Sequence, residues 1–417
     1  MRTKPSSSPI SRRQFLKMGM GFAAAGLATG VMGKRLLNPI DVVRAAGPAP
    51  DLHLAGTDGW VSMPVPPAIP PYHPDDLAPN PFTTYIFGFA DVTGMTPDQV
   101  LGKKEQAQLS APLVWMDENV DFRLQLSNLG LAVRPDLIDS HTFHFHGFRN
   151  AIPAFDGEPT SSISVPIGRD LTYLYRPHNP GTYMYHCHFE DVEHVHMGMT
   201  GIVYIRPAQN QNPLNPGEKY AYNDGDGSTR YDREFPMLFT ELWAFAHWCD
   251  SHIQLPEWSD YKPDFFLING RTYPDTLEPN GDPNSTAAGR LQYQPYSSLV
   301  TANSGERVLL RMSNLGFQIQ SLTVPGLKLH VVGKDATLMR GRDGTDTSFW
   351  TNTISLAPGE SVDAIFEAPH VSSPTTYLLY NRDFNRASNG NPGHGGQMTE
   401  IRIYPAGTLP AQSQPNA

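Results

Sequence analysis

The segments Phe122-Arg-Leu-Gln-Leu-Ser-Asn-Leu-Gly130 and Val308-Leu-Leu-Arg-Met-Ser-Asn-Leu-Gly316 carry one pattern twice. The first alternates apolar and polar residues, which is typical of a strand with one buried face. In both, Asn and Gly follow the strand and mark a turn. Because the two segments lie far apart in one chain, they indicate an internal duplication of a β unit.

Three further pairs of segments follow in the same order and strengthen this interpretation. They are Ile163-Ser164 before Gly168 with Ile354-Ser355 before Gly359, Thr182-Tyr183 with Thr376-Tyr377, and Met199-Thr200 with Met398-Thr399. Other strand-like alternations begin at Thr83, Leu171 and Gly201. Short strands at this spacing predict an all-β fold of two tandem β-sandwiches. We expect them at residues 83–207 and 233–405, with a turn-rich linker at 208–232 and a tail at 406–417.

The composition agrees with a turn-rich β protein. Among 417 residues there are 36 Gly and 39 Pro. Charged residues make up 17%, below the roughly 25% of an average soluble domain. Two Cys are too few for a disulfide framework, so a functional cysteine must have another role.

The N-terminus resembles an export signal rather than part of the fold. Ser11-Arg-Arg-Gln-Phe-Leu-Lys17 is a twin-arginine motif, and an apolar run from Met18 to Gly33 follows it. That run is shorter than the roughly 20 residues of a membrane span. We therefore expect a signal at 1–45, cleavage near Ala45 or Ala46, no membrane span in the mature chain, and a periplasmic or extracellular location. Residues 46–82 are Pro-rich and predict a surface arm.

Removal of this signal makes the chain strongly acidic. The whole sequence carries 31 basic and 41 acidic residues, a net charge of −10. Without residues 1–45 it retains 23 basic and 40 acidic residues, a net charge of −17. This charge argues against a nucleic-acid partner, which needs a basic surface. It favours cationic or metal-ion electron donors.

Seven of the 15 histidines fall in two short clusters of the first repeat. The clusters are His141-Thr-Phe-His144-Phe-His146-Gly147 and His186-Cys187-His188 with His194, His196 and Met199. Alternate side chains of a strand share a face. His186 and His188 should therefore face one way and Cys187 the other. By the same rule, His144 and His146 should face away from His141.

This pattern predicts two metal sites back to back. A cysteine site of His141, Cys187, His194 and Met199 offers a thiolate, two imidazoles and a thioether, the ligands of blue copper. A four-histidine face of His144, His146, His186 and His188 suits copper at a site for substrate or dioxygen. The backbone from Cys187 to its two histidine neighbours would carry electrons between the sites.

The two motifs, H-x-x-H-x-H-G and H-C-H with a later H-x-x-x-x-M, resemble those of multicopper oxidases. The length resembles the two-domain, laccase-like branch, which is related to copper nitrite reductases. The resemblance implies Greek-key, cupredoxin-like domains and oxidation of a reducing substrate coupled to dioxygen reduction. It implies type 1 copper at the cysteine site, type 2 copper on His144, and type 3 copper on His146, His186 and His188.

The chain departs from the family pattern in two ways. First, Phe189-Glu-Asp-Val-Glu193 lengthens the loop after Cys187; the spacing to Met199 then selects His194 as the ligand and leaves His196 as the alternative. Second, the other repeat has lost its ligands. Gln320, Thr323 and Pro325 stand where the first repeat has His141, His144 and His146, and Tyr380-Asn381-Arg382 stands for His186-Cys187-His188.

The lost ligands leave three functions open. These are a copper oxidase of small-molecule or metal-ion donors, an electron-transfer or copper-binding protein with type 1 copper alone, and a nitrite reductase-like enzyme. If a second copy completes the four-histidine face, a homotrimer is expected, since a heterologous contact closes a ring. His330 and His394 could approach such a copper, although structural roles are expected for both. His247-Trp-Cys249-Asp-Ser-His252 has metal-type residues, but the sequence shows no fourth ligand.

Overall fold

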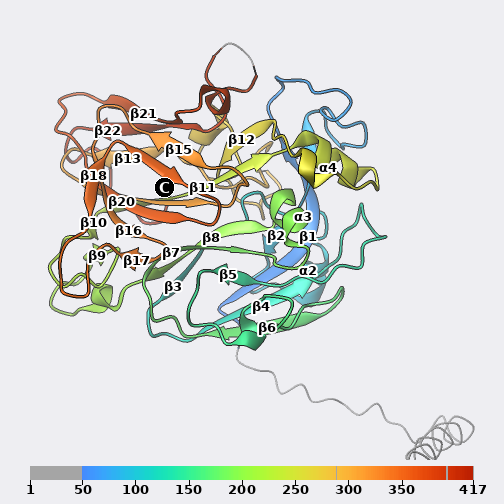
Figure 1. Ribbon diagram of the computed structural model, residues 1–417, viewed down its shortest axis with the longest axis horizontal. Coiled ribbons are helices and arrows are strands. Elements are labelled where there is room, and N and C mark those ends of the chain that lie inside the picture. Colours follow the sequence, from blue (N-terminus) through green and yellow to red (C-terminus); the bar gives the residue numbers. More distant parts are fainter. Residues whose placement is uncertain (1–48, 288, 391–392, 417) are drawn as a thin grey trace, which may run out of the picture. The chain divides into compact units, whose positions relative to one another are not determined.

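The computed structural model describes residues 49–287, 289–390 and 393–416. These residues form an all-β fold of four main sheets, arranged as two tandem β-sandwiches (Figure 1). This confirms the predicted fold class. The predicted twin-arginine signal at 1–45 lies outside the described residues. Within the described part of the chain, every helix is too short or too polar to cross a bilayer.

The first sandwich consists of two four-stranded sheets. One has the order β2-β1-β4-β6 and the other β3-β8-β7-β5. The strands are β1 (Leu52–Ser62), β2 (Thr83–Asp91), β3 (Val114–Asp117), β4 (Phe122–Asn128), β5 (His144–His146), β6 (Asp170–Tyr175), β7 (Gly181–His186) and β8 (Thr200–Arg206). The alternations beginning at Thr83, Phe122, Leu171 and Gly201 are therefore confirmed as strands. Helix α2 (Pro97–Leu101) follows β2, and α3 (Asp191–Met197) joins β7 to β8.

The second sandwich repeats this plan with longer sheets. One has the order β12-β11-β14-β20-β16-β17, with β18 also on β16, and the other β13-β22-β21-β15-β19. Helix α4 (Ala244–Ser251) lies between β11 and β12. The strands are β11 (Arg233–Leu242), β12 (Phe265–Ile268), β13 (Val300–Asn303), β14 (Arg307–Asn314), β15 (Gln320–Thr323), β16 (Leu329–Lys334), β17 (Thr337–Leu338), β18 (Phe349–Thr351), β19 (Thr353–Leu356), β20 (Ser361–Glu367), β21 (Thr375–Asn381) and β22 (Met398–Tyr404). Two short strands, β9 (Lys219–Tyr220) and β10 (Arg230–Tyr231), pair within the predicted linker.

The duplicated Asn-Leu-Gly segments make the same hydrogen bonds in both sandwiches. The Asn128 side-chain amide donates to the carbonyl oxygens of Asp139 and Val165, and its Oδ1 accepts from the Gly130 amide at 2.8 Å. Asn314 likewise donates to two carbonyl oxygens, and its Oδ1 accepts from the Gly316 amide at 2.9 Å. The strands that carry them, β4 and β14, each pair in parallel with one neighbour and antiparallel with another. The duplication predicted from the sequence is thus one of structure.

The segment expected to be a surface arm differs from the prediction. Residues 52–62 form β1, which pairs antiparallel with β2 and parallel with β4. Leu54, Gly56 and Asp58 within it are buried. The Gly and Asp residues interrupt the apolar alternation, so the strand was not recognisable from local pattern alone. The Pro-rich part of the expected arm begins only at Pro64.

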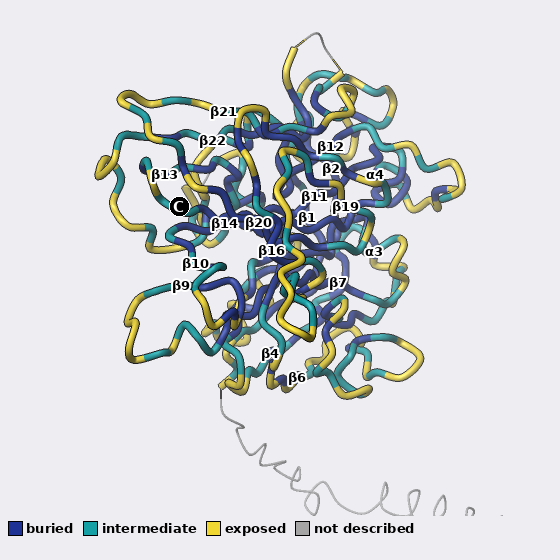
Figure 2. The backbone as a smooth tube through the Cα atoms, turned by 60° about the vertical axis from the view of Figure 1, so that its left-hand side comes forward, coloured by how far each residue is buried: buried dark blue, intermediate teal, exposed yellow. Residues whose placement is uncertain are grey.

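Each sandwich has its own apolar core between its two sheets. Exposed residues gather on the loops around the buried strands (Figure 2). In the first core, Phe143 stacks on Tyr185 with ring centroids 4.5 Å apart. Phe143 separates His141 from His144 in the sequence, and Tyr185 precedes His186. Core packing of these two rings therefore fixes the backbone that carries both histidine clusters.

A buried arginine connects the two sandwiches. Arg311 on β14 is fully buried, donates to Glu234 at 2.8 Å and lies 3.6 Å from Asp363. It also donates to the Thr182 hydroxyl of β7 and lies 4.2 Å from the ring centroid of Tyr204 on β8. The Thr182 hydroxyl in turn donates to Asp363 at 2.6 Å. The strand that leads to His186 is thus attached to the second sandwich by buried polar contacts.

This network predicts a large effect of Arg311→Leu on stability. The substitution leaves the buried carboxylates of Glu234 and Asp363 without their cation, which costs about 3–5 kcal/mol. The free energy of unfolding, measured by chemical denaturation, should fall by that amount. Arg206→Ala is the control, because its ion pair with Asp117 is more than a third exposed and contributes about 0–1 kcal/mol. Equal losses in the two variants would contradict the prediction.

Candidate metal centres

Strands β5 and β7 place the two histidine clusters side by side. They pair antiparallel, with His144 opposite His186 and Phe145 opposite Tyr185. Phe145 and Tyr185 point into the core, which leaves the flanking histidines on the other face. Cys187 follows directly after β7 and is fully buried. The structure therefore separates Cys187 from His186 by facing them in opposite directions.

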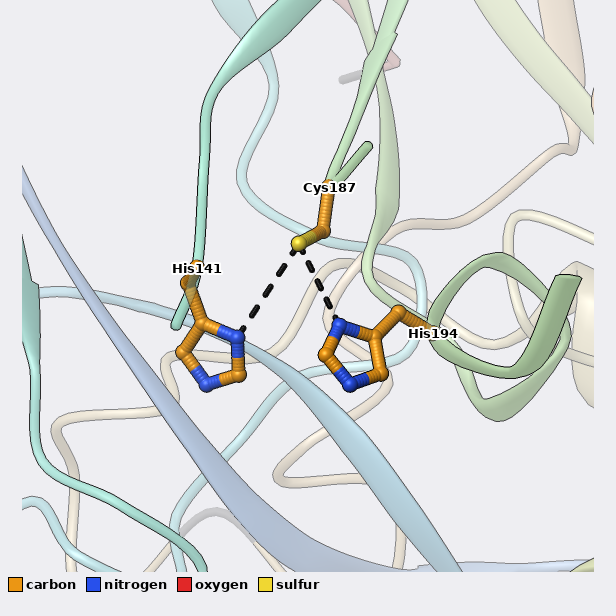
Figure 3. Close-up of side chains that lie close together, drawn as sticks. All are labelled: His141, Cys187 and His194. Carbon is orange, nitrogen blue, oxygen red and sulfur yellow. Dashed lines mark hydrogen bonds between the residues drawn. The ribbon is translucent and has the colours of Figure 1, made fainter. Parts of the chain in front are cut away.

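Cys187 lies beside two imidazoles at the cysteine site (Figure 3). Its Sγ is 3.3 Å from Nδ1 of His194 and 3.9 Å from Nδ1 of His141. These three ligand atoms lie within 4.8 Å of one another, and all three residues are buried. One nitrogen and one sulfur bound to the same ion, at bond lengths of roughly 2.0–2.3 Å, lie roughly 3.4–3.7 Å apart. The donor set and its spacing therefore fit a single metal ion.

Met199 is attached to this site through the backbone. The Cys187 amide donates to the Met199 carbonyl oxygen at 3.1 Å, and the Met199 amide donates to the His194 carbonyl oxygen at 2.9 Å. The Met199 side chain is fully buried in the same core. The backbone of Met199, the fourth predicted ligand, is thus hydrogen-bonded to both Cys187 and His194.

His194 and His196 lie on opposite sides of α3. His194 faces Cys187, whereas Nε2 of His196 accepts a hydrogen bond from the Trp243 amide at 3.1 Å. The His196 ring packs against Trp258, Tyr261 and Phe317 of the second sandwich. The spacing argument selected His194, and the structure places that residue at the sulfur.

In the absence of a metal, the contact between Cys187 and His194 favours a thiolate beside an imidazolium. Burial opposes ionisation of the thiol, but the adjacent imidazoles of His194 and His141 bring the pKa of Cys187 well below its ordinary value. Burial also lowers the pKa of His194, but the Cys187 thiolate and then Asp139 outweigh it and raise that pKa. A thiolate is the form of cysteine that binds metal.

Two residues that sequence reasoning missed shape the cysteine site. A side chain at Gly56 of β1 would place its Cβ 2.6 Å from Cδ2 of His141, so only glycine leaves room for that ring. Asp139 Oδ2 lies 3.5 Å from Nε2 of His194. Asp139 stands two residues before His141, but its contact is with His194 of the other cluster. Gly56 lies far from both clusters in the sequence and approaches His141 through the pairing of β1 with β4.

The second group is the four-histidine face. Ring centroids of His144 and His188 are 4.9 Å apart, those of His144 and His186 are 5.2 Å apart, and those of His186 and His188 are 5.3 Å apart. The ligand nitrogens of His144, His146 and His186 lie within 4.8 Å of one another. His188 adjoins the rings of His144 and His186 but is not part of this tighter set, and its side chain is 27% exposed, compared with 14% for His144.

Hydrogen bonds orient two of these rings. Nδ1 of His144 donates to the Asp156 carbonyl oxygen at 2.6 Å, and Nδ1 of His186 donates to the Cys187 carbonyl oxygen at 2.7 Å. Metal-binding histidines commonly donate one ring N–H to a carbonyl and use the other nitrogen as ligand. In both rings, Nε2 is consequently the nitrogen available to a metal. Nε2 of His186 lies 3.4 Å from Nδ1 of His146.

Burial favours the neutral form of His144, His146 and His186. It lowers the pKa of His144 and of His146, and that of His186 to about 3. The neighbouring imidazoles lower these values further. Neutral imidazole is the ligand form, so the rings are ready for a cation at neutral pH.

The second sandwich fills the equivalent positions with hydrogen-bonded amides. Asn381, at the position of Cys187, donates to Oε1 of Gln320, at the position of His141, at 2.8 Å. Asn381 also donates to Gln397 at 2.7 Å, and Gln320 donates to Glu241. A closed amide network therefore stands where the first sandwich has its cysteine site.

The remaining candidates lie apart from both groups. His330 stacks on Trp350 and contacts the Ser348 hydroxyl at 2.6 Å, and His394 is exposed. His247 contacts the Tyr85 carbonyl oxygen through Nδ1 at 2.6 Å. Cys249 is a buried free thiol, and burial raises its pKa to about 11.

Comparison with known families finds multicopper oxidases. Two multicopper oxidase family models match residues 91–209 and 246–404, together about two thirds of the chain. The sequence is 26% identical over 266 residues to laccase-5 of Arabidopsis thaliana, a match that covers 61% of this chain and 38% of the relative. Laccase-7 of Oryza sativa subsp. japonica is 26% identical over 257 residues, covering 57% and 37%. The chain thus spans about two fifths of the length of these curated relatives that it matches.

Solved structures of two kinds share the fold. The multicopper oxidase mgLAC has a TM-score of 0.57 at 19% identity, with 87% of each chain covered. A copper nitrite reductase from Nitrosomonas europaea has a TM-score of 0.53 at 16% identity, covering 88% of this chain and 96% of that one. At this identity the similarity establishes the fold.

We predict that Gly56→Ala disturbs the cysteine site. The added methyl group would displace the His141 ring, so copper affinity measured by equilibrium dialysis should fall at least about tenfold, as for loss of an oriented ligand. Gly281→Ala is the control, because a Cβ at residue 281 would lie 3.7 Å from its nearest neighbour atom outside the adjacent residues, the carbonyl oxygen of Leu291, which is an ordinary contact distance. Unchanged affinity in Gly56→Ala would show that His141 is not held by this contact.

The two cysteines should also titrate separately in metal-free protein. Because the pKa of Cys187 is lowered by the adjacent imidazoles, we expect its thiolate to persist below the pH at which an ordinary cysteine thiolate is protonated, and to be lost as pH falls through that lowered value. Cys249 should ionise only near pH 11. Thiolate ultraviolet absorbance against pH should therefore show one thiolate at pH 7 that Cys187→Ser removes and Cys249→Ser retains. A protein without thiolate at pH 7 would contradict the ion pair.

Proposed function

Because the chain belongs to the multicopper oxidase family, we propose that it is a copper-dependent oxidoreductase. It would remove electrons one at a time from a reducing substrate at the cysteine site and deliver them to dioxygen at the four-histidine face. The chain spans only part of the length of its curated relatives. The proposed activity is therefore inferred from the residues of this chain and not from those relatives.

One observation supports the proposal: the consecutive residues His186 and Cys187 belong to two different groups of candidate metal ligands. Cys187 Sγ faces Nδ1 of His194, whereas His186 packs with His144 and His146. A covalent path of a single peptide unit therefore joins the two groups. Electron transfer between them needs no moving part, because both ends are fixed by β7 and its pairing with β5.

The residues of each group have separate roles in this proposal. His141, Cys187, His194 and Met199 would hold type 1 copper. His144 would hold type 2 copper, and His146, His186 and His188 would hold type 3 copper or a site of fewer copper ions. Bound copper supplies reversible one-electron chemistry, since soft sulfur suits Cu(I) and imidazole suits Cu(II).

The electron donor would approach the edge of His194. One carboxylate oxygen of Asp139, one of Glu190 and one ring nitrogen of His194 all lie within 4.8 Å of one another, and Glu190 is exposed. These carboxylates favour a small cationic molecule or a metal ion over an anionic donor. His194, with Nδ1 toward Cys187 and Nε2 toward Asp139, would connect the donor to the sulfur.

One observation favours a second candidate, a type 1 electron-transfer protein. The amides of Gln320 and Asn381 bond to each other, and no imidazole occupies their positions in the second sandwich. The second sandwich therefore has no histidine or cysteine at the positions where the first sandwich has the candidate copper ligands of its H-x-x-H-x-H-G and H-C-H motifs. The third candidate is a nitrite reductase-like enzyme with a single type 2 copper on His146 and His186. His144 argues against it, because it stands where such an enzyme needs an acid to protonate its substrate.

Export, assembly and domain limits belong to the same proposal. We infer a twin-arginine signal at 1–45 and a periplasmic or extracellular location from the sequence motif. The domain limits proposed are 83–207 and 233–405, the first extended by β1. A homotrimer would let a second copy cover the four-histidine face, where His188 is partly exposed.

Copper content and oxygen uptake test the proposal together. The copper-loaded oxidase should contain more than one copper per chain, show the intense visible thiolate-to-copper absorption, and consume oxygen with phenols, ferrous or cuprous ions. His144→Ala should lower oxygen uptake at least about a hundredfold, a loss typical of removing a metal ligand or its partner, and retain the visible band. The exposed His178, which contacts Asn119, provides the matched control His178→Ala.

The alternatives give different results in these measurements. One copper per chain with the visible band and no oxygen uptake would establish the electron-transfer protein. Two coppers per chain with nitrite reduction would establish the reductase-like enzyme. Electron paramagnetic resonance assigns each copper to its type and so completes the count.

A further inference from the structure

The motif His247-Trp-Cys249-Asp-Ser-His252 has metal-type residues that the copper sites do not use. The structure disperses them: His247 contacts a backbone carbonyl oxygen, and Cys249 is buried as a thiol. His252, at the end of α4, instead reaches two carboxylates from residues 64–82. Together with these two carboxylates it forms a group whose ligand atoms could hold a metal ion.

Three ligand atoms converge there. Nε2 of His252 lies 2.9 Å from Oδ1 of Asp76 and 3.8 Å from Oδ1 of Asp75. All three atoms lie within 4.8 Å of one another. Asp75 is buried, with 4% of its side chain exposed, whereas Asp76 is 82% exposed. The group is thus anchored on its inner side and open on its outer side.

The His252 ring is held in the orientation of a ligand. Its Nδ1 lies 2.9 Å from the Trp248 carbonyl oxygen and donates to it, and the ring stacks on Trp248 at 4.2 Å between centroids. The nitrogen facing the two carboxylates is therefore Nε2. A ring N–H bound to a backbone carbonyl, with the other nitrogen directed at carboxylates, is the usual setting of a metal-binding histidine.

Asp75 is oriented by hydrogen bonds in the same manner. Its Oδ2 accepts from the Ser251 hydroxyl at 2.6 Å, and its Oδ1 accepts from the Leu77 amide at 2.8 Å. Each carboxylate oxygen keeps a free lone pair, since a carboxylate has about four acceptor positions. Two of the three ligands are therefore fixed before any ion binds, and only the exposed Asp76 must adjust.

We propose that Asp75, Asp76 and His252 bind a divalent transition-metal ion, with zinc as the preferred occupant. One imidazole and two carboxylates with an open fourth position match zinc coordination with a water molecule. The absence of sulfur disfavours Cu(I). The site is independent of the proposed oxidase chemistry, because none of its residues belongs to the cysteine site or the four-histidine face.

The ion would fasten residues 64–82 to the second sandwich. Asp75 and Asp76 belong to that Pro-rich segment, and His252 follows α4. A protonated His252 would also pair with Asp76, but such a pair at a largely exposed carboxylate is weak. A metal ion would hold the same contact without a proton on His252.

The test counts metal in the full, copper-loaded protein. We expect dialysis at pH 8 against zinc to add one zinc per chain relative to His252→Asn and to the exposed-ligand variant Asp76→Asn. Either variant should weaken this zinc binding at least tenfold. His330→Asn is the control, because His330 stacks on a tryptophan in a similar way but faces no carboxylate pair. Cobalt in place of zinc provides a visible spectrum of the same site.

Hydrogen exchange gives an independent readout of the clamp. Zinc should slow amide exchange in residues 72–78 of the parent protein and of His330→Asn, and should leave exchange in His252→Asn unchanged. Equal zinc content and equal exchange in parent and both ligand variants would overturn the proposal. Oxygen uptake should be the same in all four proteins, so failure here is distinguishable from failure of the oxidase proposal.

Discussion

The alternation of side chains through His186-Cys187-His188 is the constraint on which the rest of the site depends. Because successive residues of an extended chain face opposite sides, one short segment serves a buried sulfur site and an outer imidazole face. The alternation is held by Tyr185, which packs into the core against Phe143. A shift of one residue in the register of β7 against β5 would turn Cys187 outward and both histidines inward.

The two sandwiches share a backbone plan but not a chemistry. Asn128 and Asn314 make equivalent hydrogen bonds, so the turns that follow β4 and β14 are built alike. At the ligand positions, Gln320 and Asn381 satisfy each other where His141 and Cys187 face each other in the first sandwich. Buried polar groups require partners, and an amide pair provides them without an ion. Loss of the ligands thus left the fold of the second sandwich intact.

Much of the fold and of the cysteine site could be predicted from the sequence, because the patterns that indicate them are local. Strand alternation and the duplicated segments are local patterns, and they predicted the fold and strands β2, β4, β6 and β8 of the first sandwich correctly. The spacing from Cys187 to Met199 singled out His194 over His196. Strand β1, Gly56 and Asp139 could not be recognised, because each acts through contacts with distant segments. The weak apolar pattern of residues 52–62 becomes a strand only when β2 and β4 are beside it.

The contacts of the lengthened loop explain what a second sandwich without ligands contributes. Helix α3 carries His194 toward Cys187, and on its other side His196 accepts from the Trp243 amide and packs among aromatic rings of the second sandwich. Farther along, Arg134 in the first sandwich donates to Asp250 of α4 at 2.6 Å, both side chains buried. The ligand loop is therefore clamped between the two sandwiches. Since a metal site depends on how rigidly its ligands are held, the second sandwich supports the cysteine site by holding its ligand loop in place.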